Sequence, residues 1–177
     1  MSQPYQVYYT SGTTGKPKRV ILSLDIVCKH ATGAIDAMRI NGSDVWGHFA
    51  PMFHLVDAFA IYSITYCGGR HVVLPSFDVA NVLRTFEREM VTCVNMASTM
   101  LSIVASSAQA PLTDLTSMRI LSCGGSPIAP ATQRKVFALF GCKFFVSYGM
   151  TECCGKISIS LIDRSERADL SPAHIFD

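Results

Sequence analysis

Apolar and polar positions follow two patterns along this chain, and each pattern predicts a different element. Short runs that are apolar throughout, bounded by glycine, proline or asparagine, are typical of strands buried on both faces of a sheet. Apolar residues spaced three and four positions apart are typical of helices with one buried face. The first pattern predicts six strands, at residues 20–22, 45–49, 71–74, 91–96, 118–122 and 143–147.

The helical pattern lies between these runs. It predicts helices after a cap at Ser23 or Asp25, over residues 55–66, after Asp78, over residues 100–105 and over residues 131–140. In the helix after Asp78, one face would carry Val79, Val82, Leu83, Phe86 and Met90. Strands that alternate with helices predict an α/β fold with a mostly parallel sheet flanked by helices on both faces.

Composition indicates one globular domain over residues 1–177, because 49% of the residues are hydrophobic and 16% are charged. The net charge of +2 argues against a strong general attraction to nucleic acid or to an acidic membrane surface. The longest apolar stretch, residues 55–66, contains Asp57 and is too short to span a bilayer. We expect no nucleic-acid partner and no transmembrane segment, and the oligomeric state stays open.

The seven cysteines are odd in number and include no Cys-x-x-Cys spacing. Most of them lie within apolar runs, so we interpret them as buried thiols of a reducing compartment, not as a disulfide framework or a zinc site. We expect a cytoplasmic location, and a peroxisomal or membrane-peripheral one remains open.

A polar stretch near the amino terminus has the features of a phosphate-binding loop. It consists of Thr10, Ser11, Gly12, Thr13, Thr14, Gly15, Lys16, Pro17 and Lys18. The glycines let backbone N–H groups converge on phosphate oxygens, and the hydroxyls and lysines add donors and positive charge. The spacing differs from the P-loop of NTPases, which opens directly into a helix. A flexible Ser/Thr/Gly linker is the alternative, but two lysines around a proline favour the phosphate loop.

Three further segments follow predicted strands at the carboxyl end, where ligands bind in parallel sheets. They are residues 51–54, which end in His54, residues 123–127, which contain Gly124, Gly125 and Ser126, and residues 148–152, which contain Tyr148, Gly149, Thr151 and Glu152. An aromatic ring, a glycine, a hydroxyl and a carboxylate can supply a stacking surface, close approach, a phosphate contact and an oxygen ligand for Mg²⁺. Taken alone, residues 148–152 are more simply a loop that contains a glutamate, and His54 is more simply a structural histidine. Residues 124–127 could equally be an ordinary strand-to-helix turn.

Residues 9–18 closely resemble the signature loop of the adenylate-forming (AMP-binding) superfamily. That superfamily includes acyl-CoA synthetases, coumarate-CoA ligases, beetle luciferases and peptide-synthetase adenylation domains. Residues 148–152, Tyr-Gly-Met-Thr-Glu, resemble its second motif, and residues 51–54 and 124–127 resemble two more. Arg19, Asp57 and Ser147 stand where the family commonly has glycine, and Asp57 could narrow or polarise the acyl pocket. The resemblance implies a partial copy of the large N-terminal domain, with the small C-terminal domain absent.

The resemblance also implies roles for the matched residues. Lys16, Lys18 and residues 10–15 would hold the phosphates of ATP. Tyr148 would pack on adenine, and Gly149 would permit the close approach of the nucleotide. Thr151 would contact the α-phosphate, and Glu152 would bind Mg²⁺. His54 would position the acyl carboxylate. Gly124, Gly125 and Ser126 would line the adenine and acyl pocket. Lys16, His54 and Glu152 are thus the candidate catalytic residues.

The implied activity is that of an acid-thiol ligase. ATP would activate a fatty or aryl acid as an acyl-adenylate, and coenzyme A would then form the thioester, as in fatty acid metabolism. ATP, Mg²⁺ and coenzyme A are the implied cofactors, and a small carboxylic acid is the implied partner. We expect this chain alone to be incomplete for turnover. Two alternatives remain: an amino-acid adenylation domain, and a truncated non-catalytic module for nucleotide binding or interaction.

Overall fold

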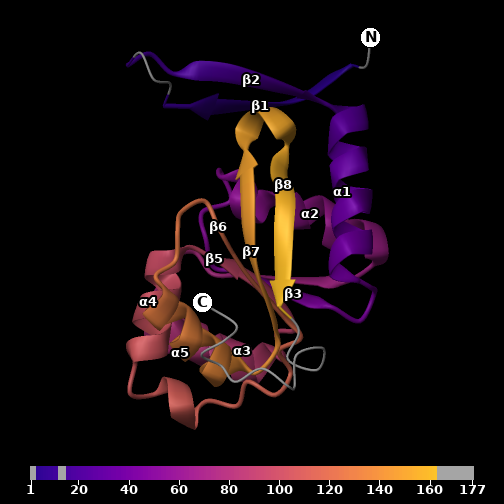
Figure 1. Cartoon of the computed structure of the whole chain (residues 1–177). Coiled ribbons are helices and arrows are strands. Elements are labelled where there is room, and N and C mark those ends of the chain that lie inside the picture. Colours follow the sequence, from indigo (N-terminus) through magenta and orange to yellow (C-terminus); the bar gives the residue numbers. More distant parts are fainter. Residues whose placement is uncertain (1–2, 12–14, 163–177) are drawn as a thin grey trace.

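The computed structural model describes residues 3–11 and 15–162 and contains two sheets of unequal size (Figure 1). The small sheet is an antiparallel hairpin of β1 (Pro4–Thr10) and β2 (Lys18–Ser23). The large sheet has the strand order β4-β3-β5-β6-β7-β8. Its strands are β3 (Val45–His48), β4 (Arg70–Val73), β5 (Cys93–Met96), β6 (Ile120–Gly124), β7 (Lys143–Met150) and β8 (Gly155–Ile162). Only β8 runs antiparallel to its neighbour, so the predicted mostly parallel α/β sheet is confirmed.

Helices cover both faces of the large sheet, as predicted. The helices α1 (Leu24–Met38) and α2 (Leu55–Cys67) lie on one face, where Trp46 and Phe59 are buried. The other face is covered by α3 (Val79–Glu89), α4 (Ser98–Ser106) and α5 (Pro130–Phe140). Two 3-10 turns, η1 (Ala110–Leu112) and η2 (Thr151–Cys153), complete the described elements. Phe144 and Phe145, neighbours on β7, each pack into one of the two cores.

Local capping explains where the helices begin and end. Ser23 caps α1 by accepting a hydrogen bond from the N–H of Ile26, and Asp78 caps α3 in the same way. The sequence predicts Met90 on the buried face of α3, but Met90 follows the helix as a left-handed cap with a φ of 51° and is 56% exposed. Because the helix ends at Glu89, Met90 points away from the core.

Three strands differ from the predictions. Neither β1 nor β8 was predicted, and the run at 20–22 was predicted as a buried strand, although Ile21 in β2 is 49% exposed. The edge strand β8 has only one covered face, and apolar residues alternate with polar ones in its sequence Lys-Ile-Ser-Ile-Ser. The strand β2 does contain a continuous apolar run, but it lies in a two-stranded sheet that leaves Ile21 on the exposed face. Continuous apolar runs therefore do not predict a strand such as β8.

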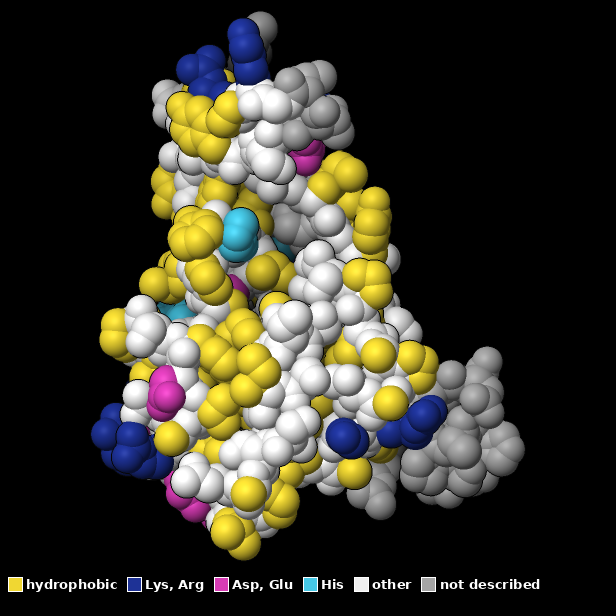
Figure 2. All heavy atoms as spheres, turned by 90° about the vertical axis from the view of Figure 1, so that its left-hand side faces the viewer, with side chains coloured by type: hydrophobic (Ala, Val, Ile, Leu, Met, Phe, Trp, Pro, Cys, Tyr) yellow, Lys and Arg dark blue, Asp and Glu magenta, His cyan; other side chains and the backbone are white. Residues whose placement is uncertain are grey.

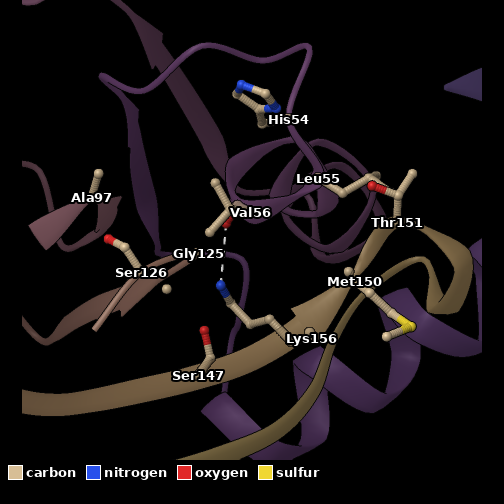
Figure 3. Close-up of a pocket in the computed structure, with 13 residues that line it drawn as sticks. His54, Leu55, Val56, Ala97, Gly125, Ser126, Ser147, Met150, Thr151 and Lys156 are labelled. Atoms are coloured by element: carbon tan, nitrogen blue, oxygen red, sulfur yellow. Dashed lines mark hydrogen bonds between the residues drawn. The ribbon is translucent and has the colours of Figure 1, made fainter. Parts of the chain in front are cut away.

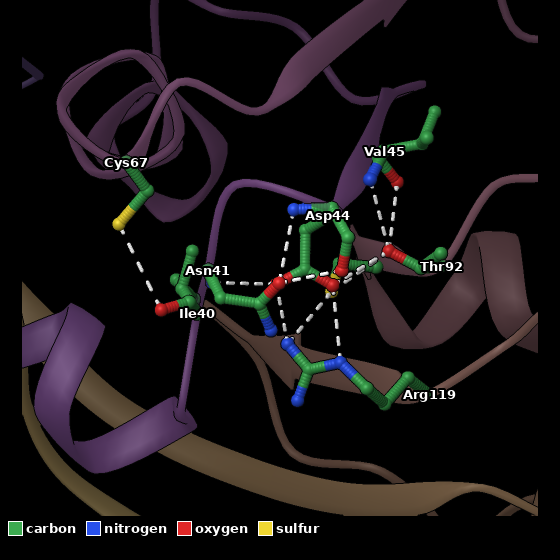
Figure 4. A network of polar contacts seen from close by, with 9 residues as sticks. Ile40, Asn41, Asp44, Val45, Cys67, Thr92 and Arg119 are labelled. Atoms are coloured by element: carbon green, nitrogen blue, oxygen red, sulfur yellow. Dashed lines mark hydrogen bonds and ion pairs between the residues drawn. The ribbon is translucent and has the colours of Figure 1, made fainter.

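A buried carboxylate ties together the amino ends of three neighbouring strands (Figure 4). Asp44, just before β3, is 2% exposed. It accepts hydrogen bonds from Nε of Arg119 at 3.0 Å, from the hydroxyl of Thr92 at 2.9 Å and from the N–H of Asn41 at 2.9 Å. Thr92 precedes β5 and Arg119 precedes β6. The opposite, carboxyl edge of these strands is where the predicted site segments lie.

All seven cysteines lie in the described residues and are free thiols. Cys93, Cys123 and Cys154 are buried as expected, whereas Cys28 and Cys153 are exposed. Burial raises the pKa of Cys93 to about 12 and that of Cys123 to about 11. No helix within the described ranges has the length and apolar character needed to cross a membrane.

Candidate functional site

A cavity of about 320 Å³ opens at the carboxyl edge of the large sheet (Figure 3). It lies beyond the ends of β5, β6 and β7 and beside the start of α2, where a parallel sheet is expected to bind ligands. Its lining consists of His54, Leu55, Val56, Ala97, Gly124, Gly125, Ser126, Ser147, Gly149, Met150, Thr151, Gly155 and Lys156. On the face shown in Figure 2, hydrophobic side chains gather in the middle, and Lys and Arg side chains lie toward its upper and lower ends.

Six of the predicted site residues line this cavity, and they come from three separate segments. They are His54, Gly124, Gly125, Ser126, Gly149 and Thr151. His54 is the exposed residue that precedes α2, and its ring lies 4.5 Å from that of Phe53 between centroids. Thr151 begins η2 after β7. The structure therefore brings together segments that are about a hundred residues apart in the sequence.

The loop after β6 presents bare backbone to the cavity. Gly125 has φ of 84°, a conformation that favours glycine. A Cβ on Gly124 would lie 2.4 Å from the hydroxyl of Ser147, so a larger residue does not fit there without rearrangement. Ser126 is held by a 2.8 Å hydrogen bond between its hydroxyl and that of Ser98. A flat ligand can thus approach the main chain closely at this loop.

Tyr148 and Glu152 lie outside the lining of the cavity. Tyr148 is 65% exposed near the end of β7, and Glu152 is an exposed residue of η2. Both are next to lining residues, Gly149 and Thr151, so they stand at its border. They remain accessible to a ligand that extends out of the cavity.

The predicted phosphate loop belongs to the hairpin and not to the cavity wall. Ser11, Gly15, Lys16 and Lys18 are exposed, Thr10 is partly buried, and Gly15 has the positive φ expected, 80°. The residues Gly12, Thr13 and Thr14 lie outside the described residues. None of the described loop residues lines the cavity. The hairpin is nevertheless anchored close by, because Leu22 of β2 packs with Cys154, which follows η2.

Sequence reasoning missed Lys156, at the start of β8. Its ammonium nitrogen donates hydrogen bonds to the carbonyl of Val56 at 3.1 Å and to Oδ1 of Asn95 at 3.0 Å, and lies 4.5 Å from the ring centroid of Phe59. Burial lowers the pKa of Lys156 to about 7, although Asp57 and Cys123 act in the opposite direction. The alternation of β8 places Lys156 on the same face as Ser158 and Ser160, so the sequence gives no signal for it. The inward position follows from the irregular pairing with β7 at this point, where the register shifts between Tyr148 and Gly149.

The sequence suggests that Asp57, beside the family motif, could narrow or polarise an acyl pocket. In the structure Asp57 does not line the cavity. It is fully buried and accepts hydrogen bonds from Nε1 of Trp46 and from Nδ1 of His48, both at 2.9 Å. The other ring nitrogen of His48 is 2.9 Å from Nδ1 of His71. Asp57 therefore affects the cavity through its charge, which favours the protonated form of Lys156.

The described side chains could help to bind a metal ion that comes with a phosphate ligand, but they do not form a complete metal site by themselves. Within residues 3–11 and 15–162, no three His, Cys, Asp or Glu side chains are grouped so as to hold a metal ion. Glu152 offers one exposed carboxylate. Mg²⁺ commonly binds through one or two carboxylates together with waters and substrate phosphates, so this residue fits such an ion.

Comparison with known proteins identifies similar chains. The model of the family described as AMP-binding enzyme matches residues 1–174. A 2-succinylbenzoate–CoA ligase of Bacillus pumilus is 32% identical over 158 residues, which cover 89% of this chain and 32% of the relative. The 4-coumarate–CoA ligase 1 of Arabidopsis thaliana is 31% identical over 162 residues, with 86% and 28% covered.

Among solved structures, the o-succinylbenzoate coenzyme A synthetase of Bacillus subtilis, in complex with ATP and magnesium ion, superposes with a TM-score of 0.77. It is 29% identical, and the match covers 93% of this chain and 33% of that one. The chain thus spans about a third of the length of the relatives it matches.

Proposed function

The chain belongs to the AMP-binding enzyme family, and we propose that the protein activates a carboxylic acid with ATP and then joins the acyl group to coenzyme A. In the first step a carboxylate oxygen attacks the α-phosphorus, and pyrophosphate leaves. In the second step the thiol sulfur attacks the acyl carbon, AMP leaves and the thiol proton is released. The observation that carries this proposal is the convergence of three motif segments on one cavity at the carboxyl edge of the sheet.

The nucleotide would lie across the border of the cavity toward the hairpin. Tyr148 is exposed and can offer its ring to adenine, while Thr151 can donate its hydroxyl to the α-phosphate. Lys16 and Lys18, with residues 10–15, would hold the β- and γ-phosphates and the departing pyrophosphate. Both lysines are exposed and free to reach a polyphosphate. Positioning and charge neutralisation of this kind account for most of the catalysis in phosphate chemistry.

The acid would occupy the cavity itself. His54 would align the reacting carboxylate, and Gly124, Gly125 and Ser126 would contact the acyl group and the adenine through backbone and hydroxyl. Leu55 and Val56 supply apolar surface at the start of α2. Glu152 would hold Mg²⁺, which neutralises charge on the phosphates when it is bound.

A direct binding test uses this chain with ATP and Mg²⁺ in a titration calorimeter. We expect binding that weakens about tenfold or more for Lys16→Met and for Glu152→Gln, since each removes a charged contact to the phosphates or their metal. Lys135→Met, which removes an exposed lysine from α5, is the matched control and should bind like the parent. No affinity for the nucleotide, or equal affinity in all four proteins, would refute the proposed site.

Turnover is tested separately by pyrophosphate release with a panel of fatty, aryl and amino acids. We propose an acid other than an amino acid as substrate, a choice supported by the relatives named as CoA ligases of aromatic acids. The seven free thiols support a reducing compartment such as the cytoplasm as the place of action.

A further inference from the structure

We propose that Lys156 binds a second acidic group of the substrate, so that the cavity selects dicarboxylic acids over monocarboxylic acids of the same length. This inference rests on the proposed function, because it assumes that the cavity holds the acid. His54 and Lys156 line the same cavity from different segments, since His54 precedes α2 and Lys156 lies in β8. One group can therefore face the reacting carboxylate while the other faces the remote one.

The hydrogen bonds of Lys156 leave room for such a ligand. An ammonium group has three N–H donors, and the carbonyl of Val56 and Oδ1 of Asn95 accept from two of them. Both acceptors are neutral. Among the described residues, no ion pair includes Lys156. One N–H donor thus remains at the wall of the cavity, and the charge has no anionic partner there in the ranges that the structure describes, although the ammonium nitrogen lies 4.5 Å from the ring centroid of Phe59. Figure 3 shows this nitrogen directed toward Val56.

An unpaired ammonium in such a place is unfavourable for folding unless something offsets it. Removing a charge from water without a partner costs free energy, and the buried position lowers the pKa of Lys156 accordingly. A purely structural link between β8 and α2 needs only hydrogen bonds, which a neutral amide could make. Retaining a cation is useful where an anion arrives, because the anion supplies the missing partner and stabilises the charged form.

The surroundings suit a small acid with a polar end. Asn95 is fully buried, and its Nδ2 has no hydrogen-bond partner in the described part of the chain. Its Oδ1 accepts from Lys156 and from the hydroxyl of Ser122. Val56, Ala97 and Met150 supply apolar lining for the carbons between the two acidic groups. The volume of about 320 Å³ lies near the lower end of the usual range for ligand pockets.

The charge of Lys156 also predicts how the preference depends on pH. The titratable groups around it are Asp57 on α2, Cys123 on β6 and His30 on α1, together with His54 in the cavity wall. The lysine is protonated below its pKa of about 7 and loses its charge as the pH rises through that value. Selection of a second carboxylate is therefore strongest in mild acid and declines in mild base.

The test measures binding of matched acids directly, by calorimetry, with and without ATP and Mg²⁺. The pairs are pentanoate with glutarate and hexanoate with adipate. At about pH 6 we expect the dicarboxylate to bind about tenfold tighter or better than its partner, as for a charge-assisted hydrogen bond. Lys156→Met should abolish the difference, Lys156→Arg should keep part of it, and the exposed control Lys135→Met should keep all of it.

A preference that is absent in the parent, or that survives in Lys156→Met, would overturn the inference. Thermal melts establish that each variant is folded, and the parent alone still tests the idea, since its preference must fall between about pH 6 and about pH 9. A dicarboxylate preference without nucleotide binding would refute the proposed function and leave the inference on the acid intact. Nucleotide binding without a dicarboxylate preference would refute the inference on Lys156 and leave the proposed function intact.

Discussion

At the scale of single residues, a buried charge and a partly buried one at opposite edges of the sheet have different kinds of partner. Asp44 is satisfied by Arg119, Thr92 and the main chain, whereas Lys156 has only neutral acceptors among the described residues. The first arrangement holds strands together, and the second leaves a charge available at a cavity. The contrast suggests a structural role for one and a binding role for the other.

Asp44 provides a prediction about stability and pH. Burial alone would raise the pKa of this carboxyl, but the hydrogen bonds from Arg119, the Asn41 N–H and Thr92 lower it. Because the folded pKa is lowered, the stabilisation is complete above the ordinary value near 4 and is lost as the pH falls through the folded pKa. We expect Asp44→Asn to lower the free energy of unfolding by about 2 kcal/mol at neutral pH.

Urea denaturation of the parent and Asp44→Asn across that pH range measures the effect. The gap between the two proteins should shrink as the parent's carboxyl becomes protonated. Asp36→Asn is the control, because its exposed pair with Arg39 is expected to contribute little. A gap that does not change with pH would show that the charge of Asp44 is not what stabilises the fold.

Residues within contiguous motifs could be predicted as site candidates from the sequence, and Lys156 could not. Thr151 and Gly149 belong to a recognisable run of five residues that follows a strand. The surroundings of Lys156 come instead from Val56 in α2 and Asn95 in β5, which lie far from it in the chain. Burial and pairing of a lysine depend on such distant partners, so they become visible only in the folded structure.

At the scale of elements, the junction of β7 and β8 has little space to spare. A Cβ on Gly149 would lie 1.9 Å from the carbonyl oxygen of Gly155, which is a main-chain atom and cannot move aside alone. We expect Gly149→Ala to separate the two strands locally, to lower the free energy of unfolding by about 2 kcal/mol or more, and to weaken nucleotide binding beside Thr151.

Gly33→Ala in α1 is the matched control. No heavy atom outside its own helix environment lies within 4 Å of the added Cβ, so the helix should gain up to about 1 kcal/mol. Urea midpoints of the two variants should therefore move in opposite directions. Equal stability of Gly149→Ala and the parent would mean that the junction can open without cost.

The edge strand β8 also shows why some elements escaped prediction. Strands buried on both faces, such as β5 and β6, are mostly apolar, with one polar residue each, and they are predicted from the sequence. The alternating sequence of β8 suits an antiparallel strand with one covered face, and its pairing with β7 depends on the turn through η2. The alternation of apolar and polar residues is present in the sequence of β8, but it indicates a strand only when the pairing with β7 is known.

At the scale of the whole molecule, ligands bind at the carboxyl edge of a parallel sheet, and this rule was enough to predict that three loops lie at one site. It could not place the hairpin, because β1 and β2 do not join the large sheet. Leu22 of the hairpin packs in a hydrophobic cluster with Val27, Leu55, Ala58 and Cys154. This cluster has fewer residues than the two hydrophobic clusters of the large sheet. The proposed phosphate loop is therefore carried by an element with fewer buried contacts.

This division predicts two levels of protection in native-state hydrogen exchange. Amides of β5 and β6, at the centre of the large sheet, should exchange only on global unfolding. Amides of β1 and β2 should exchange through local opening, because an isolated two-stranded sheet is marginal in water. Exchange followed by NMR measures both groups in one sample. Equal protection of the hairpin and the central strands would contradict the prediction.

A single hydroxyl allows this opening to be changed selectively. Gln6 of β1 donates a side-chain hydrogen bond to the hydroxyl of Tyr62 in α2, and the Tyr5 and Tyr62 rings are in edge contact at 6.2 Å between centroids. Removing the hydroxyl in Tyr62→Phe should speed exchange in β1 and β2 about fivefold, as for the loss of about 1 kcal/mol, and leave β5 and β6 unchanged. Tyr66→Phe, on the same helix and 76% exposed, should alter neither. If Tyr62→Phe accelerates all strands alike, the hairpin and the sheet unfold as one unit, and the phosphate loop does not move independently of the cavity.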